Sequence, residues 1–149
     1  MQLVLDELGN TAAYLQQKIT VGSRDINVRY VRPHLYKHLA PAGSVAIEIR
    51  DASQVLIATS DSVTITDIDA ANYFHGEVRF DVSARLLKNT SYYIRLVSSG
   101  YSYAANAFIG WCQDFDLRKV GVDYTPAGSL NTPFLLELWE LKRVDKGRI

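Results

Sequence analysis

The stretch EVRFDV at residues 77–82, followed by SYYIRLVSSGYSYAANAFIGW at residues 91–111, decides the fold. It contains three short runs that are typical of β-strands. In the first two runs every second residue is apolar, which predicts strands with one face against a core and the other against solvent. The third run, at residues 108–112, is apolar on both faces and favours a strand deeper in the structure.

Further apolar or β-branched runs flank this stretch and predict more strands. They lie at residues 14–20, 26–31, 45–50, 55–60, 62–68 and 134–142. We expect Pro33 to end the strand at residues 26–31, because proline cannot donate a hydrogen bond to a sheet ladder. Residues 33–40 fit either a helix or a strand. Residues 41–44 predict a turn, and residues 113–133 a long irregular region. Short strands between turn signals predict an all-β, antiparallel β-sandwich.

The chain has 149 residues, which is the size of one domain. We divide it into an N-terminal arm (residues 1–10), the sandwich (11–142) and a basic C-terminal tail (143–149). The arm carries apolar side chains among acidic ones, which predicts docking on a neighbouring protein through Leu3, Leu5 and Leu8. It lacks a long apolar run, so neither a signal peptide nor a membrane span is predicted.

The charges are balanced, with 16 Lys and Arg against 16 Asp and Glu. A broad nucleic-acid-binding surface needs a clustered positive excess, so we expect no nucleic-acid partner. The single cysteine, Cys112, excludes a disulfide within the chain. Because it stands in an apolar run, we interpret it as a core residue rather than a nucleophile.

Catalytic and cofactor motifs are absent from the sequence. It contains no G-x-S-x-G, no H-E-x-x-H and no glycine-rich phosphate loop. Three acidic pairs are candidate metal ligands, namely Asp67 with Asp69, Asp114 with Asp116, and Glu77 with Asp81. Aspartate is a common turn residue and no calcium-loop spacing follows these pairs. We therefore expect no enzyme, no metal and no cofactor.

Polar side chains alternate with apolar ones in the two strands that decide the fold. If these strands are neighbours in one sheet, then Arg79, Tyr93 and Arg95 share a surface with Glu77 and Asp81. The pattern fits an ordinary solvated sheet face. It fits equally a face that contacts another subunit, or a sugar bound through arginine.

Three aromatic residues follow in the same stretch, Tyr101, Tyr103 and Trp111. Aromatic side chains serve as sugar platforms, as interface anchors and as core residues. We expect Trp111 in the core, and Tyr101 and Tyr103 in contact with a ligand or a partner.

Several of these segments together resemble a known group of domains. They are the turn PAGS (residues 41–44), the strands VAIEIRD (45–51) and VLIATS (55–60), GEVRFDV (76–82) and LLKNTSYYIRL (86–96). In this order they resemble small jelly-roll sandwiches related to carbohydrate-binding modules, which occur in secreted surface proteins and in bacteriophage virions. The resemblance implies a jelly-roll-like fold, and it carries over no sugar-contacting residue.

Because neither a signal peptide nor an attached catalytic domain is predicted, we expect a virion rather than a secreted surface protein. The protein would then be a structural protein of a bacteriophage virion, such as a head decoration protein or a fibre-base subunit. Such a protein binds other virion proteins and symmetry-related copies of itself, as a homo-oligomer located in the particle. The alternative is a carbohydrate-binding, receptor-binding module of a tail fibre or surface protein that recognises a host surface polysaccharide.

Overall fold

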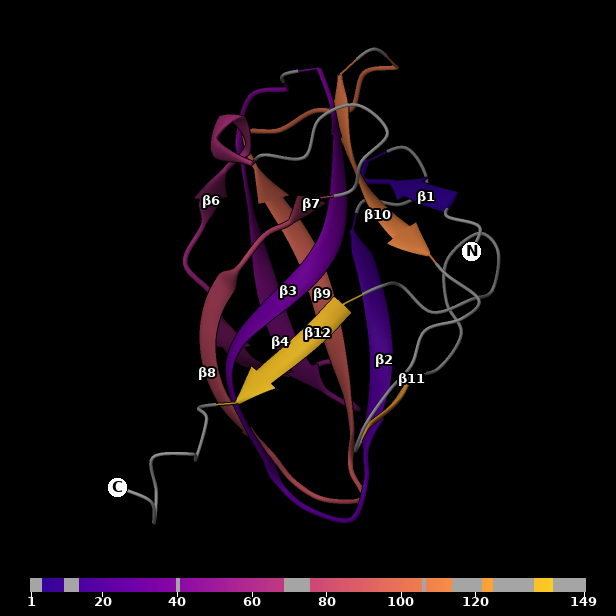
Figure 1. The fold of residues 1–149 in the computed structure, drawn as a ribbon, viewed down its shortest axis with the longest axis vertical. Coiled ribbons are helices and arrows are strands. Elements are labelled where there is room, and N and C mark those ends of the chain that lie inside the picture. The colour runs from indigo at the N-terminus through magenta and orange to yellow at the C-terminus, as the bar shows by residue number, and fades with distance from the viewer. Residues whose placement is uncertain are drawn as a thin grey trace.

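The structure of the protein is a computed structural model, in which two antiparallel β-sheets pack face to face (Figure 1). It describes residues 4–9, 14–39, 41–68, 76–105, 107–113, 122–124 and 136–140. The predicted all-β, antiparallel sandwich is confirmed. No helix in this described part is long and apolar enough to cross a membrane.

The first sheet is built around β3 (Ile26–His38), the longest strand. One edge of β3 pairs with β10 (Phe108–Gln113) and with β12 (Leu136–Glu140), and β1 (Val4–Glu7) pairs with β10. The other edge pairs with β7 (Gly76–Glu77) and β8 (Phe80–Leu86). All of these pairs are antiparallel.

The second sheet has its strands in the order β11-β2-β9-β4-β5, with β6 also paired to β4. Their bounds are β2 (Leu15–Val21), β4 (Ser44–Asp51), β5 (Leu56–Thr59), β6 (Val63–Thr64), β9 (Ser91–Ser99) and β11 (Val122–Tyr124). A 3-10 turn, η1 (Ile65–Asp67), follows β6. The runs at residues 45–50 and 55–60 correspond to β4 and β5, which pair as an antiparallel hairpin, and the run at residues 62–68 divides into β6 and η1.

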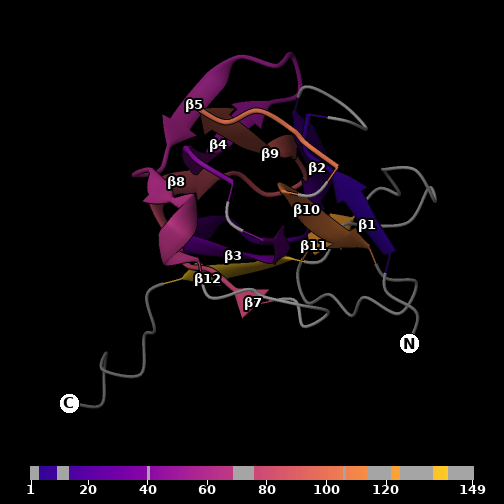
Figure 2. The same ribbon diagram turned by 90° about the horizontal axis from the view of Figure 1, so that it is seen from above.

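The chain passes from one sheet to the other at most of its connections. β2 and β4 belong to the second sheet and β3 lies between them in the first; β8, β9 and β10 alternate in the same way. Figure 2 shows the two layers from above, with β5, β4, β9 and β2 in one and β3 and β12 in the other. Strands that follow one another in the sequence therefore mostly lie in opposite layers of the sandwich.

The core lies between the sheets and follows the predicted alternation. In β8 and β9 the side chains of Phe80, Val82, Ile94 and Leu96 are buried, whereas Asp81 is exposed. Trp111 on β10 is fully buried, so its prediction as a core residue is confirmed. Residues from both sheets form one apolar cluster. Burial of this kind is the main stabilising term of a sandwich.

The prediction that Pro33 ends a strand is wrong, since β3 continues through it to His38. On one edge of β3, the ladder runs from Ile26 to Val31 against β8 and resumes at His34 against β7. Residues 32 and 33 face the interruption between β7 and β8. A residue without an N–H group is tolerated at such an interruption, where no ladder bond is required.

Two further segments differ from their predictions. Within the region 113–133, which was expected to be irregular, β11 pairs with β2 through Val122, Asp123 and Tyr124. At the N-terminus, Val4–Glu7 forms β1 rather than a separate arm, since it pairs with β10. Residues 143–149, the predicted tail, lie outside the described residues.

Candidate ligand-binding surface

The outer face of the second sheet carries a row of polar side chains. Residues directly opposite one another in neighbouring strands point to the same face. Arg95 on β9 is opposite Gln16 on β2 and Glu48 on β4, and Glu48 is in turn opposite Thr59 on β5. A parallel row joins Lys18, Tyr93 and Arg50. The register of four strands therefore gathers these side chains.

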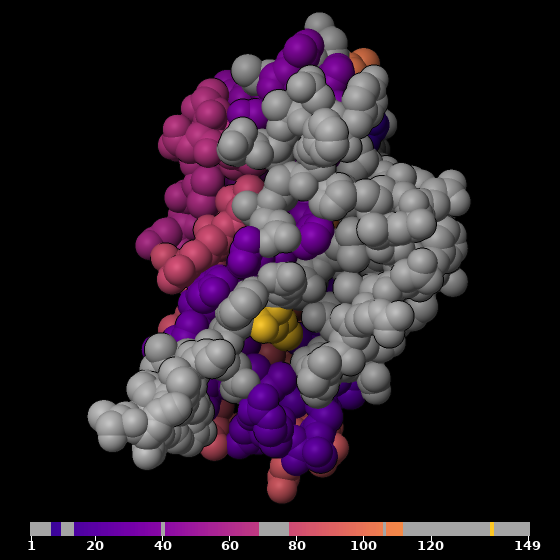
Figure 3. All heavy atoms as spheres, in the orientation of Figure 1, coloured from indigo at the N-terminus to yellow at the C-terminus, as the bar shows by residue number. Residues whose placement is uncertain are grey.

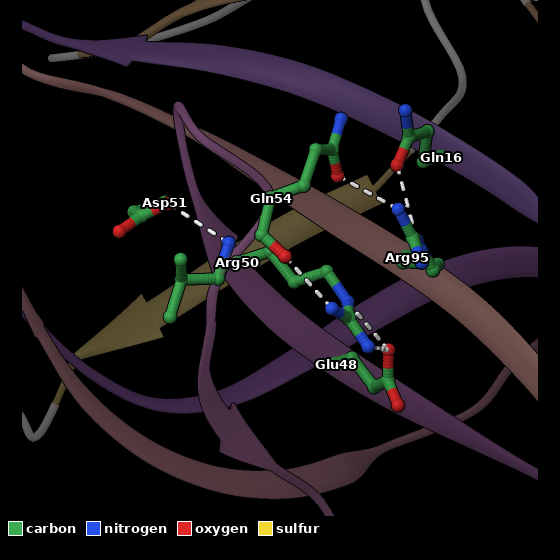
Figure 4. Close-up of polar contacts among 7 residues, drawn as sticks. Gln16, Glu48, Arg50, Asp51, Gln54 and Arg95 are labelled. Carbon is green, nitrogen blue, oxygen red and sulfur yellow. Dashed lines mark hydrogen bonds and ion pairs between the residues drawn. The ribbon is translucent and has the colours of Figure 1, made fainter.

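Arg95 lies at the centre of this row and is held by two glutamines (Figure 4). Its Nε donates a hydrogen bond of 3.1 Å to Oε1 of Gln16, and its Nη2 donates one of 2.7 Å to Oε1 of Gln54. The guanidinium carbon also lies 3.8 Å from the centre of the Tyr14 ring. Three side chains from two separate parts of the sequence thus fix one arginine.

Gln54 reaches Arg95 from the turn between β4 and β5. Its backbone has a φ of 71°, in the left-handed region that non-glycine residues rarely adopt. The turn holds this conformation, because Oδ1 of Asp51 accepts hydrogen bonds of 2.9 Å from the N–H groups of Ser53 and Val55. The turn therefore determines where the Gln54 side chain points.

A second arginine joins the same network (Figure 4). Nη1 of Arg50 donates a 2.8 Å hydrogen bond to the main-chain oxygen of Gln54, and its Nε and Nη2 lie 2.8 Å from Oε1 of Glu48. The side chains of Arg50 and Glu48 are only 22% and 17% exposed. Gln54 therefore links two arginines, one paired with a carboxylate and one with amide oxygens.

Two tyrosines flank these polar groups. Tyr14 is 41% exposed, and Tyr93 is half-buried with the ammonium of Lys18 lying 5.9 Å from the centre of its ring. We call this set the Arg95 surface. It consists of Tyr14, Gln16, Lys18, Glu48, Arg50, Gln54, Tyr93 and Arg95. An arrangement of planar polar groups beside tyrosine rings suits binding rather than chemistry on a bound molecule.

The structure brings Tyr93 and Arg95 together but places Arg79 elsewhere. Arg79 lies between β7 and β8, which both pair with β3 in the first sheet, whereas Tyr93 and Arg95 lie on β9 in the second. The first sheet faces the viewer in Figure 1, and atoms of β3 and β8 contribute to the surface in the same orientation (Figure 3). The condition for a single shared face is therefore not met, since the two strands lie in different sheets. Arg79 instead pairs with Asp81 at 2.6 Å.

Tyr101 holds two strands of its own chain together. Its hydroxyl donates a 2.8 Å hydrogen bond to the carbonyl oxygen of Leu8 and accepts one of 3.1 Å from the N–H of Ile109. Burial is the main cause that raises the pKa of Tyr101. The hydroxyl thus satisfies main-chain groups beside β1 and β10, which is a structural role.

Tyr103 lies beside an aromatic cluster at one end of the first sheet. Its ring centre is 5.7 Å from that of Phe108, which is in turn 5.2 Å from the ring of His38. Desolvation, followed by a hydrogen bond to Glu7, raises the pKa of Tyr103. Tyr103 therefore contacts Phe108 of β10 and Glu7 of β1, and it does not lie beside Arg95.

The predicted docking residues of the N-terminus have separate placements. Leu3 lies outside the described residues. The backbone of Leu5 pairs with Cys112 in the ladder between β1 and β10. Leu8 is fully buried in the core of its own chain, and its N–H donates a 2.8 Å hydrogen bond to the carbonyl of Ile109. Its side chain is therefore not exposed to a partner.

Among the described residues, no three histidine, cysteine, aspartate or glutamate side chains cluster as metal ligands. Three of the candidate acidic residues, Asp69, Asp114 and Asp116, lie outside the described residues.

The sequence of this chain matches no protein-family model and no curated protein.

Sequence reasoning missed most of the Arg95 surface. Arg95 and Tyr93 were selected from their alternation, but Tyr14, Gln16 and Gln54 were not. The alternation of Gln16 and Lys18 with buried Leu15, Gln17 and Ile19 marks an outward strand face. That signal was available, but no pattern in the sequence shows that β2 and β9 are neighbours.

Proposed function

We propose that this protein is a structural protein of a bacteriophage particle, a head decoration or fibre-base subunit that acts by binding. The observation that carries this proposal is the uncharged, exposed edge strand β5. The resemblance of several segments of the chain to jelly-roll domains of bacteriophage virions supports the choice of a bacteriophage particle. The partners would be other virion proteins and symmetry-related copies of the same chain.

β5 forms the end of the second sheet (Figure 2). Within the described part of the chain, β4 is the strand with which it pairs. The three consecutive apolar residues Val55, Leu56 and Ile57 are 59%, 46% and 43% exposed, respectively. Residues 55–60 contain no charged residue and no proline. Edge strands usually carry such residues to prevent pairing with another chain, so we expect β5 to be covered in the assembled state.

The first test is a lysine at the centre of this edge. Ile57→Lys places a charge on β5, so self-association should weaken at least about tenfold if apolar contacts of about 1.4 kcal/mol or more are lost. The measurement is solution mass by light scattering across a concentration range, together with incorporation into particles. Leu87→Lys is the matched control, because Leu87 is 50% exposed in the connection between β8 and β9.

Two results contradict the proposal. One is a wild-type protein that stays monomeric and also fails to enter particles. The other is equal incorporation of wild type and Ile57→Lys. Deletion of residues 1–10 is a poorer test, because it removes β1 and the buried Leu8 and thereby alters the sandwich itself.

A second function, a carbohydrate-binding module, is favoured by the Arg95 surface. Tyr14 is exposed beside the side-chain amides of Gln16 and Gln54, and sugars are bound by aromatic faces together with planar hydrogen-bonding groups. Tyr14→Ala should abolish retention on a host polysaccharide column and leave the circular dichroism spectrum unchanged. Unaltered retention would contradict this function. Tyr101→Ala is a less suitable variant, because it removes hydrogen bonds at Leu8 and Ile109.

A further inference from the structure

We propose that the Arg95 surface binds acidic saccharides, with the guanidinium of Arg95 receiving the carboxylate of a uronic-acid residue. This inference rests on the second function proposed above and names its ligand class. Its starting point is the chemistry of the groups that hold Arg95. They position a positive charge without neutralising it.

A comparison with other arginines supports this assignment. Arg50 contacts the carboxylate of Glu48, Arg79 contacts Asp81 and Arg85 contacts Asp25. In the described part of the chain, the hydrogen-bond acceptors of Arg95 are instead the amide oxygens of Gln16 and Gln54. Glu48 stands opposite Arg95 in the ladder, but its Oε1 is bound by Arg50. The network therefore directs the available carboxylate away from Arg95.

The geometry also leaves donors on Arg95 for a ligand. A guanidinium has five N–H donors, and the two glutamines take one from Nε and one from Nη2. A planar group held on two sides and stacked on a ring has little rotamer freedom left to lose on binding. Arginine forms short, charge-assisted hydrogen bonds with carboxylates, often two at once. Arg95 is therefore pre-organised for a carboxylate.

The charges around Arg95 also favour an anionic ligand. Lys18, Arg50 and Arg95 carry three positive charges on the Arg95 surface. Against them stand Glu48 within that surface and Asp51 at the adjoining turn, which leaves a balance of one positive charge. The whole chain carries no net charge. Asp123, in β11, occupies the position opposite Thr20 at the far edge of the sheet, away from the row of Arg95. A local positive field attracts anionic ligands and raises their rate of association.

The sugar component is inferred from the tyrosines. Tyr14 has its ring against Arg95 and is 41% exposed, so a pyranose can stack beside the same arginine that binds its carboxylate. A simple anion such as phosphate makes no use of this ring. An acidic peptide uses the charge but not the stacking, so it serves as a competing class in the test.

The experiment measures binding of the intact protein, displayed on beads to allow multivalent contact, to polygalacturonate, alginate and hyaluronate. Methyl-esterified polygalacturonate is the matched neutral polymer, and poly-glutamate is the matched acidic polymer without sugar. We expect binding to carboxylated polysaccharides and at least about tenfold weaker binding to the ester, because a charged hydrogen bond is lost. Arg95→Gln should cause a similar loss of binding, and so should Tyr14→Ala. Because Tyr14 is exposed, its replacement by alanine should leave the fold intact.

Arg79→Gln is the control variant. Arg79 also lies over a tyrosine, with its guanidinium carbon 4.1 Å from the Tyr30 ring centre, but on the first sheet and paired with Asp81. It should bind like the wild type. An equal loss in Arg79→Gln would overturn the site, and equal binding of poly-glutamate would overturn the saccharide in favour of an acidic peptide.

The remaining outcomes separate this inference from the function on which it rests. Equal binding of polygalacturonate and its methyl ester overturns the acidic class and leaves a carbohydrate-binding module. Failure to bind any acidic or neutral polysaccharide overturns both. Assembly through β5 is measured independently by light scattering and is unaffected by either result.

Discussion

Each outer face of the sandwich carries an arginine over a tyrosine ring, and the two pairs have different neighbours. On the first sheet, Arg79 lies over Tyr30 and pairs with Asp81, and both charged side chains are 61% exposed. On the second sheet, Arg95 lies over Tyr14 and is half-buried between two glutamines. An exposed ion pair neutralises its own charge and contributes little stability. The glutamine pair holds the arginine and keeps its charge available.

The largest effect is expected at Gly43, which sets the pairing of β4 with β9 and thereby the position of Glu48 opposite Arg95. Gly43 has a φ of +104°, and a Cβ there would lie 2.7 Å from main-chain atoms of Ser99 and Gly100. Gly43→Ala should destabilise the fold by about 3 kcal/mol through overpacking and backbone strain, as measured by urea unfolding.

Gly100→Ala provides the control for this substitution. Gly100 also has a positive φ of +65°, but the nearest atom to its added Cβ is 3.8 Å away. Gly100→Ala should lower the free energy of unfolding by about 1–2 kcal/mol, because only the backbone conformation is strained. If both variants lost the same free energy of unfolding, the close approach of Gly43 to β9 would not be the reason for a glycine at this position.

The next largest effect tests the comparison directly. Arg95→Met keeps an apolar stem over Tyr14 but leaves the amide oxygens of Gln16 and Gln54 without this donor. Because these groups are half-buried, we expect a loss of about 1 kcal/mol in the free energy of unfolding. A change indistinguishable from zero would mean that the glutamines position Arg95 without contributing to stability.

Acid pH should affect the two sheets differently. Asp25 lies in the turn just before β3 of the first sheet. It accepts hydrogen bonds from the main-chain N–H of Lys88 and from Arg85, which lower its pKa below the ordinary value of 3.8. A carboxyl with a lowered pKa adds stability above its unfolded pKa, and this contribution is lost as the pH falls through the folded value. The glutamines around Arg95 do not titrate.

The measurement is a pH titration of the thermal midpoint from neutral pH to below 3.8, in wild type and Asp25→Asn. The variant should lose less stability over the acid range than the wild type. NMR titration of the Asp25 carboxyl should give a midpoint below that of a free aspartate. A midpoint at or above the ordinary value would contradict the role given to Lys88 and Arg85.

The smallest effect is expected for Arg79→Gln, the counterpart of Arg95 on the first sheet. Since Arg79 and Asp81 are both 61% exposed, removal of this pair should change the free energy of unfolding by less than about 0.5 kcal/mol. Urea unfolding of Arg79→Gln beside Arg95→Met makes the comparison. A larger loss at Arg79 would reverse the ranking of the two faces.

The fold class was predictable because strand alternation is a local property. Phe80, Val82, Ile94 and Leu96 were correctly placed on an inner face, and Trp111 in the core. Pro33 was misjudged, because the proline rule applies to a continuous ladder and the interruption between β7 and β8 is a property of the folded sheet.

The candidate surface was predictable only in part. Tyr93 and Arg95 stand out by alternation within one strand. Gln54 depends on a turn with a φ of 71°, and Tyr14 on contact with a residue 81 positions later. Tyr101 resembles a surface aromatic residue in the sequence, yet its hydroxyl bonds to Leu8 and Ile109. Contacts between distant segments leave no periodic signal.

The sequence by itself determined that this protein is a β-sandwich with particular side chains turned inward, because a strand alternates its side chains with a period of two. Only the tertiary structure decided which outward side chains share a face. Strand pairing joins segments far apart in the chain, and it separated Arg79 from Arg95 while bringing Gln16 and Glu48 to either side of Arg95. The alternation within a strand is the same whichever strand lies beside it, so this outcome depends on the packing of the whole chain.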